Sequence, residues 1–151
     1  DVCSSDLPVK IGYLGRLVDI KGVHDLARAV VSLPADLPVQ VEFRGPLNSP
    51  ESKVTLAQLK EIVGTDPRVE FAPAASWKDV PAILADYDLL CCPSVWFENG
   101  PTVVNEAHAV GTPVIGTKIG GMAEIITDGV NGRLVKPGDW RSLEFVLPTT
   151  K

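Results

Sequence analysis

Short apolar runs alternate with helix-periodic runs along most of this sequence. The apolar runs predict strands at 9–14, 39–43, 69–71, 89–92, 113–115 and 132–135. Apolar spacing and turn residues predict helices at 22–33, 51–63 and 122–126, and others opening at Ser76, Pro101 and near Trp140, with Ser76 and Asp79 as a capping-box pair. Strands that alternate with helices pair in parallel and are covered on both faces. The sequence therefore predicts an α/β fold, a doubly wound parallel sheet of about six strands.

A doubly wound sheet predicts where polar residues gather. In the common strand order 3-2-1-4-5-6, strands one and four are neighbours, and ligands bind in the crevice beyond their carboxyl ends. The loop after the first strand reads GRLVDIKG and carries Gly15, Arg16 and Lys21, and the loop after the fourth reads PSVWFENGP and carries Glu98. We therefore expect these residues to line one crevice, although about eighty positions separate the two loops.

The segment after Glu98 combines turn residues with a helix start. Asn99, Gly100 and Pro101 are turn formers, and the fixed φ of Pro101 suits a first helical position. The first amides of a helix, here those up to Thr102 and Val103, lack internal partners and lie at the positive end of the helix dipole. This helix start is predicted to hold an anion such as a phosphate.

Glu106 follows eight positions after Glu98, just over one turn into the same helix. Its apolar neighbours, among them Val104 and Ala107, favour a mostly buried helix, in which a lone acid needs a partner. Acidic residues bind ribose hydroxyls in other doubly wound nucleotide sites. We expect Glu106 to bind a ribose and Glu98 to face a sugar.

The charges across the crevice fit a diphosphate. Arg16 and Lys21 are predicted to hold it from one side and the helix start from the other, which would neutralise a departing phosphate without a metal ion. Gly120 and Gly121 come just before the short helix predicted at 122–126, and backbone at these glycines can approach a ligand closely. The predicted ligand is a sugar nucleotide.

Composition narrows the classes of partner. The 151 residues are 45% hydrophobic, which fits one soluble domain, and a net charge of −5 argues against nucleic acid or an anionic membrane. Three cysteines, with Cys91 and Cys92 adjacent, form neither a disulfide framework nor a metal-ligand spacing. Without an apolar run of roughly 20 residues or a signal-like start, the sequence favours the cytoplasm.

Three segments together carry a resemblance to a known family. GRLVDIKG, ENGPTVVNEAHAVGTPVI and GGMAEIITDGVNGRLVKPGD resemble the donor-binding domain of retaining GT-B glycosyltransferases of family 4 over nearly the whole chain. The resemblance implies a Rossmann-like C-terminal half of a GT-B fold. It also implies metal-independent transfer of a sugar from a UDP-, GDP- or ADP-linked donor with retention, and no other cofactor.

Family roles carry over only to matching positions. Arg16 and Lys21 resemble the diphosphate pair, Glu106 the ribose-binding acid and Glu98 the acid near the donor sugar, while the amides of 100–103 would contact phosphate or sugar. The family often has a Gly-Phe-Gly type of sequence after the first Glu, where this chain has Asn99 to Thr102.

The same family implies a second domain. Residues 1–151 correspond to one nucleotide-sugar binding domain, and no segment corresponds to the N-terminal domain that binds the acceptor. Any peripheral membrane association would also belong to that half. We expect this chain alone to bind nucleotide weakly and to transfer no sugar at a useful rate.

The same sequence features bear on three other functions. A nicotinamide dehydrogenase is disfavoured because the first loop lacks G-x-G-x-x-G and because Arg44, not an acid, follows the second strand. A non-catalytic nucleotide-binding module is disfavoured by the presence of both Glu98 and Glu106. A sugar-nucleotide epimerase of the GT-B build remains as an alternative.

Overall fold

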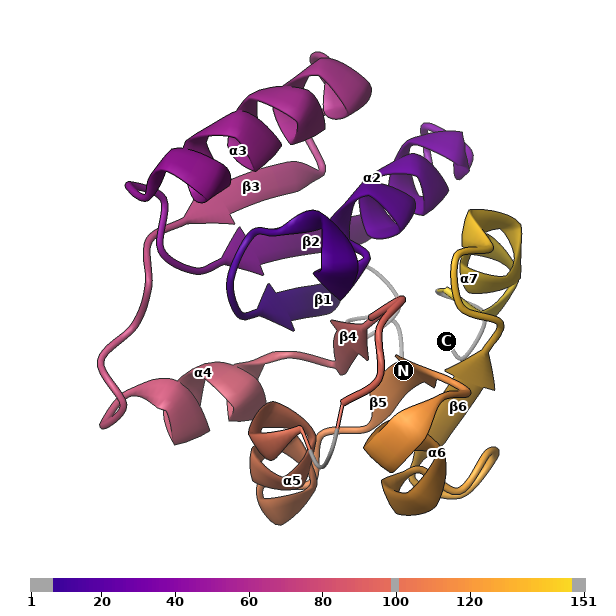
Figure 1. Cartoon of the computed structure of the whole chain (residues 1–151). Coiled ribbons are helices and arrows are strands. Elements are labelled where there is room, and N and C mark those ends of the chain that lie inside the picture. Colours follow the sequence, from indigo (N-terminus) through magenta and orange to yellow (C-terminus); the bar gives the residue numbers. More distant parts are fainter. Residues whose placement is uncertain (1–6, 99–100, 148–151) are drawn as a thin grey trace.

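The six strands of the computed structural model, which describes residues 7–98 and 101–147, form a single parallel sheet (Figure 1). The strands lie in the order β3-β2-β1-β4-β5-β6, so the predicted doubly wound sheet and the strand order assumed for it are confirmed. Their bounds are β1 Val9–Leu14, β2 Val39–Arg44, β3 Val69–Ala72, β4 Leu89–Cys92, β5 Val114–Thr117 and β6 Gly132–Val135.

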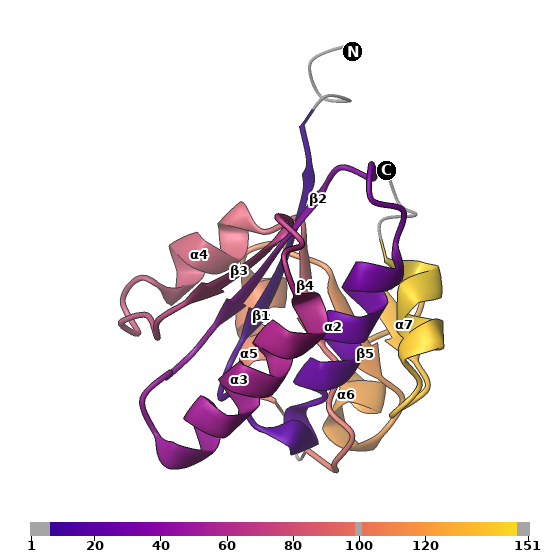
Figure 2. The same ribbon diagram turned by 90° about the horizontal axis from the view of Figure 1, so that it is seen from above.

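Helices cover both faces of this sheet (Figures 1 and 2). One layer holds α2 Val23–Ser32, α3 Pro50–Val63 and α7 Trp140–Val146, and the other holds α4 Val80–Asp86, α5 Thr102–Ala109 and α6 Gly120–Ile125. A 3-10 helix, η1 Asp19–Lys21, which the sequence did not predict, precedes α2. None of the described helices is both long enough and apolar enough to cross a membrane.

The core consists of two clusters, one under each helix layer. Successive side chains of a strand point to opposite faces, so Cys91 packs with the α2 and α3 side while Leu90 and Cys92 pack with the α4 and α5 side. Both faces of β4 are therefore buried, which explains its uninterrupted apolar sequence.

The start of α4 differs from the prediction. Ser76 and Asp79 form no reciprocal capping box: Asp79 is itself the N-cap residue, without a side-chain bond, and α4 begins at Val80. A helix capped by Ser76 would place Pro81 in its second turn, where the missing N–H removes a backbone bond. Beginning at Val80 keeps Pro81 within the first turn, where proline is tolerated.

Candidate functional site

The loops that follow β1 and β4 are joined along their backbones. The N–H of Val95 donates to the carbonyl of Ile20 at 3.0 Å. Gly22 has a left-handed φ of 74°, and a Cβ at this position would lie 1.8 Å from the Pro93 carbonyl oxygen. Only glycine allows this approach. The predicted meeting of the two loops is therefore observed.

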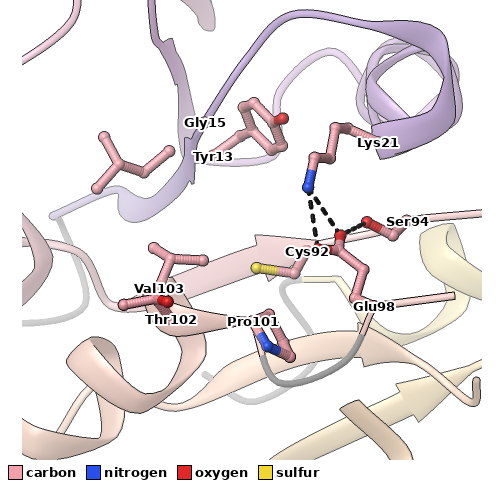
Figure 3. Close-up of a pocket in the computed structure, with 10 residues that line it drawn as sticks. Tyr13, Gly15, Lys21, Cys92, Ser94, Glu98, Pro101, Thr102 and Val103 are labelled. Carbon is pink, nitrogen blue, oxygen red and sulfur yellow. Dashed lines mark hydrogen bonds and ion pairs between the residues drawn. The ribbon is translucent and has the colours of Figure 1, made fainter. Parts of the chain in front are cut away.

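An ion pair links the two loops at the level of the side chains (Figure 3). The Lys21 ammonium lies 3.0 Å from each carboxylate oxygen of Glu98, and both side chains are largely buried. Ser94 donates its hydroxyl to the same carboxylate, and Thr117 on β5 donates to the Ser94 carbonyl at 2.6 Å. The Glu98 carboxylate is thus fixed by a cation and a hydroxyl, and the hydroxyl is itself positioned by the neighbouring strand.

A cavity of about 310 Å³ opens beside this ion pair (Figure 3). We call it the Lys21 cavity. It lies at the carboxyl ends of β1 and β4 and is lined by Tyr13, Leu14, Gly15, Lys21, Cys92, Ser94, Glu98, Pro101, Thr102 and Val103. Seven of these residues come from the two strand ends and their loops, and three from the start of α5 and the residue before it.

A second cavity of about 350 Å³ adjoins the first and extends toward β2 and β3. We call it the Arg44 cavity. It shares Leu14, Gly15, Thr102 and Val103 with the Lys21 cavity, and its other lining residues are Arg16, Arg44, Gly45, Pro46, Ala74, Ala75, Val80 and Glu106. Most of its own walls are small or apolar, with two arginines and one carboxylate among them.

The predicted residues thus divide between two adjoining cavities. Lys21 and Glu98 line the first, while Arg16 and Glu106 line the second, and Gly15 lies between them. Arg16 is exposed to solvent. The expected single crevice is therefore a pair of cavities with one common wall, along the carboxyl edge of the sheet.

The start of α5 lies one residue later than predicted. Pro101 is the N-cap residue, with an extended ψ of 115°, and the helix begins at Thr102. Thr102 and Val103 line both cavities, so the first turn of α5 borders the common wall. Asn99 and Gly100, predicted to supply a turn and amides, lie outside the described residues.

Glu106 is exposed, which corrects the expectation of a mostly buried helix. The apolar face of α5 was predicted correctly, because Val104 and Ala107 are buried, but the opposite face is open. Glu106 lies on this open face and borders the Arg44 cavity. An exposed carboxylate needs no buried partner, so its environment alone does not demand a ligand.

Gly120 and Gly121 lie against the Glu98 segment. The Gly121 N–H donates to the Glu98 carbonyl at 2.6 Å, and a Cβ on Gly120 would lie 2.8 Å from the same oxygen. The close backbone approach expected at these glycines is thus made by the chain itself. Their contact with a ligand stays a prediction.

Several residues that shape the cavities were missed. Tyr13 lines the Lys21 cavity and donates its hydroxyl to the Arg16 carbonyl at 2.5 Å, and burial raises the pKa of this phenol. Ser94 was also missed, since a single serine in a loop gives no signal. Only one sequence feature could have indicated Tyr13. A tyrosine near the end of a buried strand needs a hydrogen-bond partner for its hydroxyl.

A buried ionic cluster beneath the Arg44 cavity was missed as well. Arg44 forms a two-pronged ion pair with Glu42, at 2.9 Å from Nε and 3.0 Å from Nη2, and Tyr87 donates to the same carboxylate at 2.6 Å. Burial alone would raise the pKa of Glu42, but the bonds from Arg44 and Tyr87 outweigh it and lower the pKa. Glu42 therefore stays ionised and holds Arg44 in place.

Relatives of known activity are similar to this chain. D-inositol 3-phosphate glycosyltransferase from Mycobacterium marinum is 34% identical over 85% of this chain, and the enzyme of the same name from Salinispora tropica is 34% identical over 95%. The chain spans only 27% and 32% of the lengths of these two relatives.

Solved structures with the same fold are similar as well. The structure of HepE from Anabaena in complex with UDP and glucose superposes with a TM-score of 0.81 at 29% identity, over 92% of this chain and 37% of that one. The C-terminal domain of the group 1 glycosyl transferase LpcC from Francisella tularensis superposes with a TM-score of 0.76 at 26% identity, over 95% of this chain and 76% of that one. The expected C-terminal, Rossmann-like half of a GT-B fold is thereby confirmed.

The family-level comparison gives the same result over nearly the whole length. The family described as glycosyl transferases group 1 matches residues 5–145. Together with the relatives and the two-cavity edge of the sheet, this match makes the chain a member of the group 1 glycosyl transferases.

Proposed function

We propose that residues 1–151 bind a nucleoside diphosphate sugar across the two cavities, as the donor-binding domain of a retaining, metal-independent glycosyltransferase of family 4. The observation that carries the proposal is the common wall between the cavities, with Lys21 and Glu98 on one side of it and Arg16 and Glu106 on the other. An extended ligand with a charged centre fits this arrangement.

The diphosphate would lie along the common wall. Lys21 lines the cavity on one side of this wall and Arg16 the cavity on the other, and the first turn of α5 borders both. Cations and the positive end of a helix stabilise phosphate oxygens. When the glycosidic bond breaks, negative charge develops on the departing diphosphate, so these groups would stabilise the transition state without a metal ion.

The two ends of the ligand follow from this placement. The donor sugar would enter the Lys21 cavity, where the Glu98 carboxylate is available to its hydroxyls and to positive charge that develops at the anomeric carbon. The ribose would contact Glu106, and the base would occupy the remainder of the Arg44 cavity. Gly120 and Gly121 would act through Glu98, whose backbone they support.

Bound ligands in structural relatives support this reading. HepE from Anabaena has been crystallised with UDP and with UDP-glucose, and both structures superpose on this chain with TM-scores of at least 0.80. Because the chain spans 39% of HepE in both structures, we assign the acceptor site to polypeptide outside these 151 residues.

Titration with nucleotides tests the proposal. UDP, GDP and ADP are titrated into the chain, and the tightest binder is compared with its monophosphate by calorimetry or NMR shifts. We expect Lys21→Met to weaken the diphosphate about tenfold or more, the size of a hydrogen bond to a charged group, and to change the monophosphate much less. Lys53→Met, at an exposed position of α3, is the matched control and should change neither. A folded chain that binds none of the three diphosphates contradicts the proposal.

A further inference from the structure

Arg44 is held rigidly at the end of β2, in the wall of the cavity that bears its name. Its Nε and Nη2 atoms bond to the two oxygens of Glu42, and its Nη1 bonds to the Pro73 carbonyl at 3.3 Å. Glu42 is only 9% exposed, and its Oε1 also accepts from the Tyr87 hydroxyl. A guanidinium fixed in this way loses little conformational freedom when it binds a further group.

The protein does not use every N–H donor of Arg44. A guanidinium carries five N–H donors and no acceptor. Within residues 7–98 and 101–147, three of these donors are used by Glu42 and Pro73, one each from Nε, Nη1 and Nη2. The Tyr87 hydroxyl is a further hydrogen-bond partner of Arg44. At least one N–H therefore remains on a side chain that borders the Arg44 cavity.

The strand order places Arg44 at the end of the cavity where the base would lie. The Lys21 cavity lies over β1 and β4, whereas Arg44 ends β2, on the far side of β1. Beyond it, Ala74 and Ala75 follow β3 and form the outer wall. The small residues Gly45, Pro46, Ala74 and Ala75 leave room for a flat ring in this part of the cavity.

We infer that Arg44 selects a base that presents carbonyl acceptors, uracil or guanine, against one that presents an exocyclic amino group, cytosine or adenine. This inference rests on the proposed function. A guanidinium can only donate, and the uracil O4 and the guanine O6 accept. The amino groups of cytosine and adenine would place donor against donor and leave buried N–H groups unpaired, which weakens binding.

Matched base pairs test the inference. Dissociation constants of UDP against CDP, and of GDP against ADP, are measured on the same chain. UDP and CDP differ only at ring positions 3 and 4, where uracil has N3–H and O4 and cytosine has an acceptor N3 and an amino group. Their ratio therefore reports on this edge of the base. We expect UDP to bind at least about tenfold more tightly than CDP, and GDP more tightly than ADP, because the lost bond has a charged donor.

Substitutions at Arg44 then locate the cause. Arg44→Lys keeps a cation beside Glu42 but loses the planar fork, and it should bring the UDP to CDP ratio close to one. The double variant Glu42→Gln and Arg44→Gln removes both charges together, and it should lower the ratio equally if Arg44→Lys alone is unstable. Arg133→Gln is the control. It removes an arginine of β6 that is paired with Asp128, and it should keep the wild-type ratio.

The outcomes separate the two proposals. A wild-type ratio that falls in the Arg44 variants supports the inference. Equal binding of all four diphosphates, a preference for CDP or ADP, or a ratio that survives in folded Arg44 variants overturns the inference alone. A uniform loss of affinity in Arg44→Lys with an unchanged ratio also overturns it, because Arg44 would then contact the ribose or phosphates. If none of the four binds to the folded chain, both proposals fail.

Discussion

The Lys21 ammonium is equidistant from the two carboxylate oxygens of Glu98, at 3.0 Å from each, although the residues are 77 positions apart. Both residues line the Lys21 cavity, and the ion pair fixes the positions of their charged groups there. A preformed site loses less free energy in ordering its side chains when the ligand arrives. The pair also means that Glu98 and an incoming phosphate compete for the same cation.

Neutralising Glu98 should separate its two roles. In Glu98→Gln, Lys21 is released from its ion pair, and we expect UDP to bind up to about fivefold more tightly. UDP-glucose should lose any advantage over UDP, because the carboxylate that faces the sugar is gone. Both are measured by calorimetry, with Glu61→Gln on the exposed surface of α3 as the control. An equal weakening of UDP and UDP-glucose would show instead that Glu98 acts only by positioning Lys21.

Removing the Glu106 carboxylate should affect recognition of the ribose. We expect Glu106→Ala to lower the preference for UDP over its 2′-deoxy analogue by about tenfold, the size of one hydrogen bond to a charged group. The measurement is the ratio of the two dissociation constants. Asn105→Ala changes the adjacent exposed position of α5 and should keep the wild-type ratio. An unchanged ratio in Glu106→Ala would remove the ribose role.

The join between the two loops should depend on Gly22. Gly22 and Gly138 have nearly the same φ, 74° and 73°, but only Gly22 lies against backbone, whereas Gly138 faces open space. Gly138→Ala should therefore lower the free energy of unfolding by about 1 kcal/mol, the cost of a left-handed alanine. Gly22→Ala adds a clash with Pro93 and should cost about 1–3 kcal/mol more. Urea unfolding measures both, and equal losses would contradict the close contact.

The stability of the fold should fall in acid partly through Asp66. Arg68 bonds to Asp66 at 2.8 Å and 3.0 Å, and these bonds lower the pKa of the Asp66 carboxyl. A carboxyl whose pKa is lower in the folded state stabilises the fold above its unfolded pKa, and this stabilisation is lost as pH falls through the folded pKa.

Asp66→Asn should therefore be less stable than wild type at neutral pH. Its free energy of unfolding should also fall less between about pH 5 and pH 2. Urea unfolding across this range gives the comparison, and Asp36→Asn, in an exposed turn, should retain the wild-type pH profile. If the slopes of wild type and Asp66→Asn coincide, the Arg68 pair does not contribute as described.

The thiols of β4 should not react in the folded chain. Cys92 lines the Lys21 cavity but is only 8% exposed, and burial raises its pKa to about 12, so almost no thiolate forms near neutral pH. In a Cys3→Ser background, iodoacetamide should label neither Cys91 nor Cys92 until urea unfolds the chain. Mass spectrometry counts the labels. Labelling of Cys92 in the folded chain would show that the cavity opens to reagents.

The strands and the joined loops could be predicted from the sequence because each depends on local pattern and topology. The bounds of β1, β4 and β6 were predicted correctly from their mainly apolar sequences. The strand order then sufficed to bring Lys21 to Glu98, because adjacent parallel strands end at the same edge. This step required no knowledge of side-chain conformations.

The remaining features depend on contacts between distant side chains. Position 12 requires glycine because the Tyr87 ring fills the space beside it. A Cβ added there would lie 2.0 Å from the ring. Tyr87 in turn completes the Glu42 and Arg44 cluster from 45 positions away. Glu42 lies only two positions before Arg44, on the same face of β2, but no local pattern indicates that Tyr87 joins this pair.

The common wall of the two cavities has an evolutionary consequence. A substitution at Leu14, Gly15, Thr102 or Val103 alters both cavities at once, whereas a change at Ala75 or Ser94 alters only one. Descendants of this sequence can therefore diversify their ligand preferences most freely at the outer ends of the edge. The residues of the common wall should change most slowly, because each substitution there affects both cavities.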